Sequence, residues 1–191
     1  MSRIIAGSGK GRRLKAPRGR NTRPTGARVK QALFDILAAR MPGCRFLDVC
    51  AGSGAIGLEA TSRGAVRVIL VDASASAVAA ILANRESLRG SGGDVQVLRQ
   101  DARIALATLA DHGERFDVVY LDPPYESGLY LPLLAQLGET GLLEPEGVAV
   151  AEHFHKLDLP ERIGRLVQTR RVRVGDHRLS FYRILAGDQE R

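Results

Sequence analysis

The chain has 191 residues and a mass of 20.6 kDa, which is enough for one domain of ordinary size. Hydrophobic residues make up 45% of the sequence and charged residues 26%, so a globular fold is favoured over disorder. The sequence has no apolar run of the roughly 20 residues that span a bilayer, and its N-terminus lacks the apolar region of a secretory signal. Its two cysteines are too few for a disulfide framework or a zinc site. We therefore expect a cytoplasmic protein with reduced thiols.

Positive charge is concentrated at the N-terminal end. The formal net charge is +7, from 28 Lys and Arg residues against 21 Asp and Glu residues. Residues 1–30 contain ten of the basic residues and no acid, which leaves 18 basic against 21 acidic residues, a net charge of −3, in residues 31–191. A strongly basic segment attached to a mildly acidic body is typical of proteins that bind a polyanion such as a nucleic acid.

The predicted elements begin within this basic segment. Two short strands, at about 3–7 and 11–15, are expected on either side of a Gly-Ser-Gly-Lys turn. A helix over 25–40 follows, because its apolar residues recur at helical spacing. We place the boundary between a basic N-terminal extension, residues 1–24, and the main domain, residues 25–191, just before this helix.

From residue 45 onward, the predicted strands alternate with helices. The expected strands cover 46–50, 66–71, 95–98, 116–121 and 147–151, and the expected helices cover about 55–63, 74–88, 102–111 and 129–137. This alternation is typical of a parallel sheet with helices on both faces. Residues 171–174 and 179–185 predict a final antiparallel hairpin. The expected fold is α/β, with a mostly parallel seven-stranded sheet, a C-terminal antiparallel hairpin and a small N-terminal β-hairpin.

A glycine-rich loop follows the first strand of this alternating region. Gly52, Gly54 and Gly57 match the pattern G-x-G-x-x-G between a strand and a helix, and Asp72 ends the next strand, 20 positions after Gly52. This spacing is typical of a nucleoside-binding site, in which the acid accepts hydrogen bonds from ribose hydroxyls.

Two cofactors, NAD and S-adenosylmethionine, use loops of this kind. Asp48, on the strand just before the loop, would repel the pyrophosphate of NAD and attract an ammonium group. S-adenosylmethionine has such a group and no phosphate, so we favour it. Asp101 ends the third strand, where it could hold an adenine amino group, cap the next helix, or do both.

The fourth strand ends in Asp122-Pro123-Pro124-Tyr125. The prolines lack amide donors, so we expect the Pro123 carbonyl to have no competing donor beside it. Asp122 and this carbonyl are expected to accept hydrogen bonds from an exocyclic amine, and thereby to direct its lone pair toward a methyl group. Tyr125 is expected to stack on the ring of the base. The segment predicts methyl transfer to the amine of a single-stranded or flipped-out base.

Together these motifs resemble those of the class I, Rossmann-like methyltransferases that use S-adenosylmethionine. Several segments are similar, more specifically, to the bacterial ribosomal RNA small subunit methyltransferase D family: 3–7, 11–14, 23–25, 28–34, 46–48 and 57–60. The resemblance covers nearly the whole chain. It implies methylation of the N2 amine of one guanine in 16S rRNA, on an assembled or assembling small ribosomal subunit. We expect a monomer that needs no metal.

The resemblance also implies roles for individual residues. The residues expected to be catalytic are Asp122, Pro123 and Tyr125. The residues expected to bind the cofactor are Asp48, Ala51, Gly52, Ser53, Gly54, Asp72, Asp101 and Ala102. The basic N-terminal segment, rather than the resemblance, supplies the residues expected to contact RNA, which are Arg12, Arg13, Arg20, Arg23 and Arg28. The sequence departs from the family at Cys50, where Phe is more frequent, and at Asp72, where Glu is common.

Two other functions stay open at this point. An adenine-N6 methyltransferase acting on DNA or RNA would use the same tetrapeptide, although the chain leaves little room for a separate DNA-recognition domain. A non-catalytic RNA-binding assembly factor could retain the cofactor pocket. We interpret His153 and His155 as structural residues, Glu152 as a polar group at the rim of the crevice, and the arginines of 162–173 as a solvated face or an RNA contact.

Overall fold

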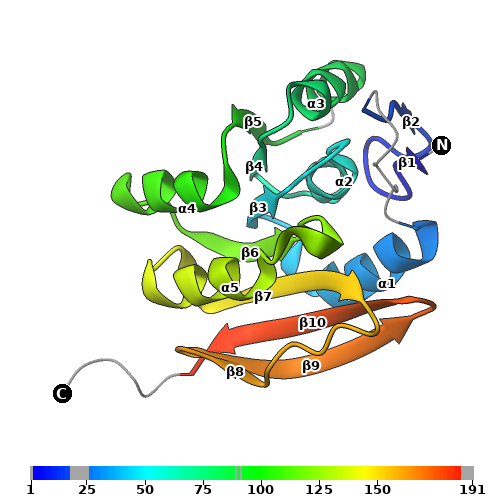
Figure 1. The fold of residues 1–191 in the computed structure, drawn as a ribbon. Helices are drawn as coiled ribbons and strands as arrows, with labels where there is room; N and C mark the ends of the chain where they lie inside the picture. Colours follow the sequence, from blue (N-terminus) through cyan, green and yellow to red (C-terminus); the bar gives the residue numbers. More distant parts are fainter. Residues whose placement is uncertain (1, 18–25, 89, 91, 186–191) are drawn as a thin grey trace.

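An eight-stranded mixed β-sheet runs through the centre of the molecule (Figure 1). The computed structural model describes residues 2–17, 26–88, 90 and 92–185. Within them, the strands of this sheet lie in the order β5-β4-β3-β6-β7-β10-β9-β8. The first five are parallel: β5 (Asp94–Arg99), β4 (Arg67–Asp72), β3 (Arg45–Val49), β6 (Phe116–Leu121) and β7 (Leu143–Phe154). The last three pair antiparallel: β10 (His177–Ile184), β9 (Leu166–Val174) and β8 (Arg162–Ile163). The predicted α/β architecture is confirmed.

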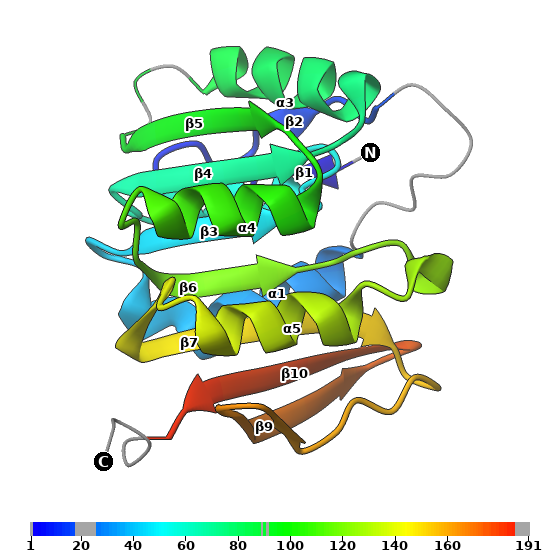
Figure 2. The ribbon, with the colours of Figure 1, turned by 60° about the vertical axis from the view of Figure 1, so that its left-hand side comes forward.

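Helices cover both faces of the sheet. One face packs against α1 (Ala27–Leu37), which continues into the short 3-10 helix η1 (Ala38–Arg40), and against α2 (Ala55–Ser62) and α3 (Ala75–Ser87). No residue of η1 is buried. The other face packs against α4 (Ala102–Asp111) and α5 (Tyr130–Glu139). Figure 2 shows α4 and α5 in front of the sheet, with the parallel strands all pointing toward one edge. We call this edge, where the parallel strands end, the carboxyl edge.

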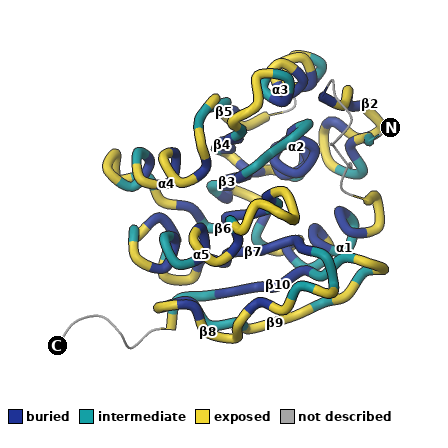
Figure 3. The backbone as a smooth tube through the Cα atoms, viewed as in Figure 1, coloured by how far each residue is buried: buried dark blue, intermediate teal, exposed yellow. Residues whose placement is uncertain are grey.

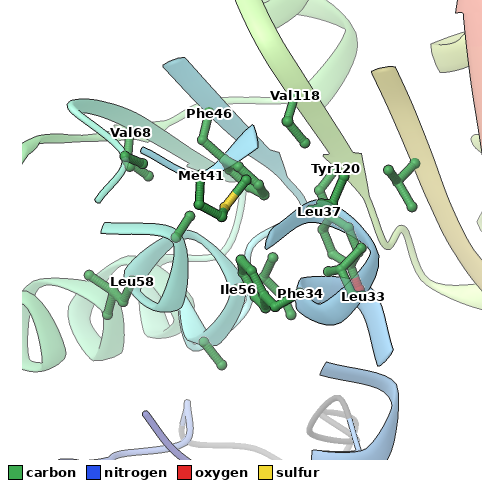
Figure 4. Close-up of a cluster of buried hydrophobic side chains, with 14 of the residues drawn as sticks. Leu33, Phe34, Leu37, Met41, Phe46, Ile56, Leu58, Val68, Val118 and Tyr120 are labelled. Carbon is green, nitrogen blue, oxygen red and sulfur yellow. The ribbon is translucent and has the colours of Figure 1, made fainter. Parts of the chain in front are cut away.

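An apolar core fills each of the two spaces between sheet and helices. On the α1 side, the rings of Phe34 and Phe46 lie 6.4 Å apart at 21°, and Figure 4 shows them among residues of α2 and β6. On the other side, Leu47 and Leu121 of the strands pack with Leu106 of α4. Because side chains of a central parallel strand are buried on both faces, these strands are continuous apolar runs, and the buried residues in Figure 3 follow them.

The C-terminal strands differ most from their predicted bounds. β7 is 12 residues long instead of five, because Leu143 already pairs with Phe116 of β6 at one end and β10 pairs with β7 as far as Phe154 at the other. β9 begins at Leu166 rather than at 171, and β8 adds an eighth strand to the seven expected. A register shift opposite Phe181 and Tyr182 interrupts the alternation of side chains along β9, so the sequence pattern does not show its full length.

The basic N-terminal segment contains a small two-stranded hairpin. Its strands, β1 (Ser2–Arg3) and β2 (Arg13–Leu14), are shorter than predicted. Ile4 and Leu14 are buried in the same apolar core as α1 and α2. The domain boundary predicted at residue 24 lies outside the described residues, and α1 begins at Ala27 after the N-cap Gly26.

Candidate functional site

The predicted cofactor loop and the predicted catalytic tetrapeptide meet at the carboxyl edge. The loop follows β3 and the tetrapeptide follows β6, and these two strands are neighbours in the sheet. The backbone N–H of Asp122 donates to the carbonyl of Val49 at 3.3 Å. Figure 2 shows that the segment after β6, the β9–β10 turn and the beginning of α1 lie at this same edge. The fold therefore brings both motifs to the place where open α/β sheets bind ligands.

The glycines of the loop have separate structural roles. Gly52 and Gly54 have φ angles of 56° and 74°, which glycine adopts without steric cost. Gly57 has no room for a side chain, since a Cβ there would lie 2.9 Å from Cδ2 of Leu70. Cys50, just before the loop, is non-glycine and yet has a φ of 63°. Such a residue stores strain in the backbone, and strained residues cluster at functional sites.

Asp72 organises the loop from the end of β4. Its Oδ2 accepts from the backbone N–H of Gly52 at 2.9 Å, and its Oδ1 accepts from that of Ser74 at 2.8 Å. A carboxylate oxygen can accept more than one hydrogen bond, so Asp72 retains capacity for ribose hydroxyls. The loop residues next to it, Ala51 and Gly52, are half-buried.

Asp101 is the N-cap of α4, with Ala102 as the first helical residue. Its Oδ1 accepts from the N–H of Arg103 at 2.9 Å and from that of Ile104 at 3.3 Å. The capping role anticipated from the sequence is therefore confirmed. The cap uses one of the two carboxylate oxygens, so the adenine-binding role, which stays a prediction, is compatible with it.

Asp48 is a buried acid beneath the glycine loop, with 1% of its surface exposed. Its Oδ2 accepts from the N–H of Gly57 at 2.8 Å, whereas Oδ1 has no hydrogen-bond partner among the described residues. Burial raises the pKa of Asp48 to about 7, and the charges of Asp72 and Glu152 add to the effect. An unsatisfied buried carboxyl oxygen beside the loop fits a cationic group such as those of S-adenosylmethionine.

Asp122 is half-buried at the end of β6. Burial raises its pKa well above the usual range, with further contributions from the negative charges of Glu152 and Asp48. The carboxyl group of Asp122 thus binds a proton more readily than an ordinary aspartate, which suits a group that receives a proton from an amine.

The Pro123 carbonyl does have a donor beside it, and our expectation for it was wrong. The hydroxyl of Tyr130, on α5, lies 3.1 Å from the Pro123 oxygen and 2.8 Å from the carbonyl oxygen of Glu152. The short 3-10 helix η2 (Tyr125–Ser127) returns the chain to α5, so a residue seven positions later reaches back to the tetrapeptide. A carbonyl oxygen has two lone pairs, so one remains for a substrate amine.

Glu152 is a fully buried residue of β7 rather than a group at the rim of the crevice. Its Oε2 accepts from the hydroxyl of Tyr120, and its Oε1 lies 2.8 Å from Nδ1 of His177. Sequence reasoning missed this interaction. The available signal was an acid directly after the apolar run 148–151, because a buried carboxylate needs polar partners.

Tyr125, the last member of the tetrapeptide, has 54% of its surface exposed. Its ring centroid lies 5.8 Å from that of Phe154, at the end of β7, with an interplanar angle of 80°. This edge-on contact holds the tyrosine ring while leaving much of it accessible, as stacking on a base would require.

A buried carboxylate anchors the N-terminal hairpin to α2. Glu59 accepts from the N–H groups of Ile5 at 2.8 Å and Ala6 at 3.0 Å. It also pairs with Nζ of Lys30 at 3.1 Å and with Nε of Arg63 at 2.8 Å. The basic segment is thereby fixed against the helix that follows the glycine loop.

The structure places three of the five predicted RNA-binding arginines. Arg12 donates to the carbonyl of Ser87 at the end of α3, while Arg13 on β2 and Arg28 on α1 are exposed. Arg20 and Arg23 lie outside the described residues.

The two histidines and two cysteines have structural surroundings. His153 Nε2 lies 2.9 Å from the Ser180 hydroxyl, and His155 Nδ1 lies 3.0 Å from the Asp176 carbonyl. Cys44 and Cys50 are free thiols whose pKa values burial raises to about 12. Among the described residues, no group of three or more His, Cys, Asp or Glu side chains could hold a metal ion. None of the helices in that part of the chain is long and apolar enough to cross a bilayer.

Comparison with known proteins places the chain among methyltransferase relatives. The family model described as "Conserved hypothetical protein 95" matches residues 2–183. The chain is 40% identical over 181 residues to the Bacillus subtilis (strain 168) protein named "Putative rRNA methyltransferase YlbH", with 95% of this chain and 98% of that protein covered. It is 34% identical over 158 residues to "Ribosomal RNA small subunit methyltransferase D" of Escherichia coli (strain K12), covering 83% and 77% of the two chains.

Solved structures share the fold. A hypothetical protein of Thermus thermophilus superposes with a TM-score of 0.81 at 35% identity, over 96% of this chain and all of that one. A SAM-dependent methyltransferase from Agrobacterium tumefaciens superposes with a TM-score of 0.57 at 20% identity, over 72% of this chain and 49% of that one.

Proposed function

The chain belongs to the conserved hypothetical protein 95 family, and from this premise we propose that it transfers a methyl group from S-adenosylmethionine to the N2 amine of a guanine in 16S ribosomal RNA. The relatives named for rRNA methylation support the broader part of this proposal, a methyltransferase that acts on rRNA. The choice of base and of the 16S molecule rests on the resemblance of the sequence motifs.

The main support is the position of the Asp122 tetrapeptide beside the glycine loop. Because β3 and β6 are adjacent, an amine held at Asp122 lies next to any ligand bound by the loop. Tyr125 offers an exposed ring for the base to which the amine belongs. A cofactor loop and a base-binding site on neighbouring strands are the arrangement that direct methyl transfer requires.

The residues proposed to hold the cofactor surround the loop. Three of these residues are aspartates, whose negative charge suits a ligand with an ammonium and a sulfonium group. We assign cofactor binding to Asp48, Ala51, Gly52, Ser53, Gly54, Asp72, Asp101 and Ala102. When bound, S-adenosylmethionine supplies an electrophilic methyl group.

Asp122 and the Pro123 carbonyl have distinct tasks in this proposal. Each accepts one hydrogen of the exocyclic amine, so that the nitrogen lone pair is directed away from both. After the new bond to nitrogen has formed, the amine carries a surplus proton. Asp122 can receive that proton, because its pKa is raised by burial and by the charges of Glu152 and Asp48. Tyr130 fixes the position of the Pro123 carbonyl through its hydroxyl.

RNA docking is proposed for the basic segment. Arg12, Arg13, Arg20, Arg23 and Arg28 supply positive charge that the body, with its net charge of −3, lacks. We treat residues 1–24 as a docking extension of the methyltransferase domain, residues 25–191. We expect a cytoplasmic monomer acting on an assembled or assembling small ribosomal subunit.

The decisive experiment identifies the methylated nucleoside. The protein is incubated with labelled S-adenosylmethionine and either undermethylated small subunits or naked 16S rRNA, and the RNA is then digested to nucleosides. We expect label in N2-methylguanosine. Label in N6-methyladenosine would replace the guanine proposal with the adenine one. Absence of transfer despite RNA binding would instead indicate an assembly factor.

A further inference from the structure

A second partly exposed surface adjoins the carboxyl edge, at the end of β7. It consists of Phe154, His155 and Lys156, at and just after the end of that strand. We call these three residues the hairpin platform. His177, the first residue of β10, pairs with Phe154 on one side and with Val174 on the other, so the β9–β10 turn lies beside the end of β7.

The platform continues the aromatic surface of Tyr125. The rings of Phe154 and His155 lie 4.7 Å apart at 58°, and Phe154 also contacts Tyr125. His155 is fixed by two contacts to the carbonyl of Asp176, one from its backbone N–H at 2.8 Å and one from Nδ1 at 3.0 Å. Aromatic rings that are held in place and partly exposed are suited to stacking on bases.

The platform also has positive charge that is not neutralised locally. Lys156 is exposed, with Nζ 5.9 Å from the ring centroid of Phe154. Within the described part of the chain, Lys156 belongs to no ion pair.

Other charged residues lie near the platform. Arg171 and Arg178 both pair with Asp158, at 3.2 and 3.3 Å, so these two arginines neutralise the charge of this nearby acid. Two further exposed acids are close in sequence to the platform and to Tyr125. They are Asp176, in the β9–β10 turn, and Glu126, next to Tyr125.

We propose that the hairpin platform binds the RNA strand on the other side of the target base from the N-terminal segment. Phe154 stacks on the base of a neighbouring nucleotide, His155 holds the Phe154 ring in place, and Lys156 contacts the adjoining phosphate. A nucleotide stacked on Phe154 would be next to the target base, because Phe154 touches Tyr125. This inference rests on the proposed function, since it needs the target base to lie at Tyr125.

The phosphate contact is tested through the salt dependence of binding. Affinity for a short single-stranded RNA is measured by fluorescence anisotropy at several salt concentrations, for the wild type and for Lys156→Ala. Each lost contact lowers the slope of log affinity against log salt by about 0.7 for single strands, so we expect a decrease of that size. The matched control is Arg115→Ala, which removes one exposed positive charge at the opposite edge. A slope that is unchanged in the platform variant, or lowered equally in the control, would overturn the phosphate contact.

The stacking contact is tested with 2-aminopurine, whose fluorescence falls when it stacks on an aromatic ring. The probe is placed at successive positions of the RNA oligonucleotide. At one position we expect quenching by the wild type and by Phe154→Tyr, but not by Phe154→Leu, with RNA affinity about tenfold weaker for the leucine variant. At the adjacent position, quenching should depend on Tyr125 instead.

The two measurements separate this inference from the proposed function. Neither of them requires methyl transfer, so an absence of methylated product would contradict the proposed function while leaving the platform result intact. If Phe154→Leu lowers the rate of transfer without changing quenching at any position, Phe154 only positions Tyr125, and the stacking role is disproved.

Discussion

Asn84 of α3 and Lys15 of the basic segment are joined by two hydrogen bonds. Oδ1 of Asn84 accepts from the N–H of Lys15 at 2.7 Å, and Nδ2 donates to the Lys15 carbonyl at 2.9 Å. Nδ2 also donates to the carbonyl of Ser53, in the glycine loop, at 2.9 Å. One buried side chain thus connects the segment expected to bind RNA with the loop expected to bind the cofactor.

Replacing this side chain should therefore affect both ends of the connection. Asn84→Ala removes three hydrogen bonds to partly buried backbone groups of Lys15 and Ser53, at a cost of about 1–3 kcal/mol in the free energy of unfolding. We expect weaker binding of both RNA and S-adenosylmethionine, measured by anisotropy and calorimetry. Leu82→Ala, on an exposed position of the same helix, is the control. Loss of only one of the two affinities would show that Asn84 does not couple the sites.

Gly7 is predicted to be indispensable for docking of the N-terminal hairpin. Its φ is +79°, and a Cβ there would lie 1.7 Å from the backbone oxygen of Ser62. Gly11 has a φ of +86° but open space around it, so Gly11→Ala introduces only the backbone strain of about 1–2 kcal/mol. In limited trypsin digestion, Gly7→Ala should expose the N-terminal segment to rapid cleavage and Gly11→Ala should not. Equal protection of the two variants would contradict the docked position of the hairpin.

Lys30 and Glu59 form a buried ion pair, and removal of the Glu59 carboxylate alone is predicted to destabilise the folded protein. Burial lowers the pKa of Lys30, and the adjacent Glu59 opposes that shift. Glu59→Gln leaves the Lys30 charge buried without its partner, which typically lowers the free energy of unfolding by about 3–5 kcal/mol. Chemical denaturation measures this loss. The double variant Lys30→Met/Glu59→Gln, which keeps the same side chain at position 59, should lose less than Glu59→Gln, and a greater loss in the double variant would argue against this electrostatic explanation.

Asp48 is expected to make stability depend on pH. Its pKa is raised to about 7 in the folded protein, against about 3.9 for an unperturbed aspartate. The proton that Asp48 binds in the folded state therefore stabilises the folded protein at low pH, and this stabilisation is lost as the pH rises through about 7. Asp48→Asn cannot ionise, so its free energy of unfolding relative to the wild type should rise between pH 5 and pH 8, on the order of 2 to 3 kcal/mol. A difference that does not vary with pH would show that Asp48 titrates normally.

The fold and two of the site motifs could be predicted from the sequence because their information is local. Alternating strands and helices, the loop at Gly52–Gly54 and the tetrapeptide at Asp122 are each contiguous in the chain. The parallel topology then brings the last two together without further information, since the carboxyl ends of parallel strands share one edge.

The contacts that were missed depend on pairing between distant strands. Glu152 meets His177 only because β10 pairs antiparallel with β7 in one particular register, in which Leu179 lies opposite Glu152. The contact between Phe154 and Tyr125 likewise joins the ends of two neighbouring strands. A one-residue shift in the pairing would turn every side chain of the strand to the other face of the sheet. The pairing of β9 with β10 contains a register shift, so the alternation of apolar residues in the sequence does not reveal which residues lie opposite each other.

Asp122 is predicted to act in the methyl transfer itself rather than in binding. Asp122→Ala removes the acceptor for the amine and for its proton, so kcat should fall by about 100-fold or more, while affinities for RNA and S-adenosylmethionine change little. Asp122→Asn keeps one acceptor oxygen but cannot receive the proton, so its activity should be intermediate and should lose the part of the pH dependence that Asp122 supplies. Single-turnover assays over a range of pH, together with anisotropy for RNA affinity, measure both effects. If Asp122→Ala transfers methyl groups at the wild-type rate, the proposed role of the tetrapeptide is wrong.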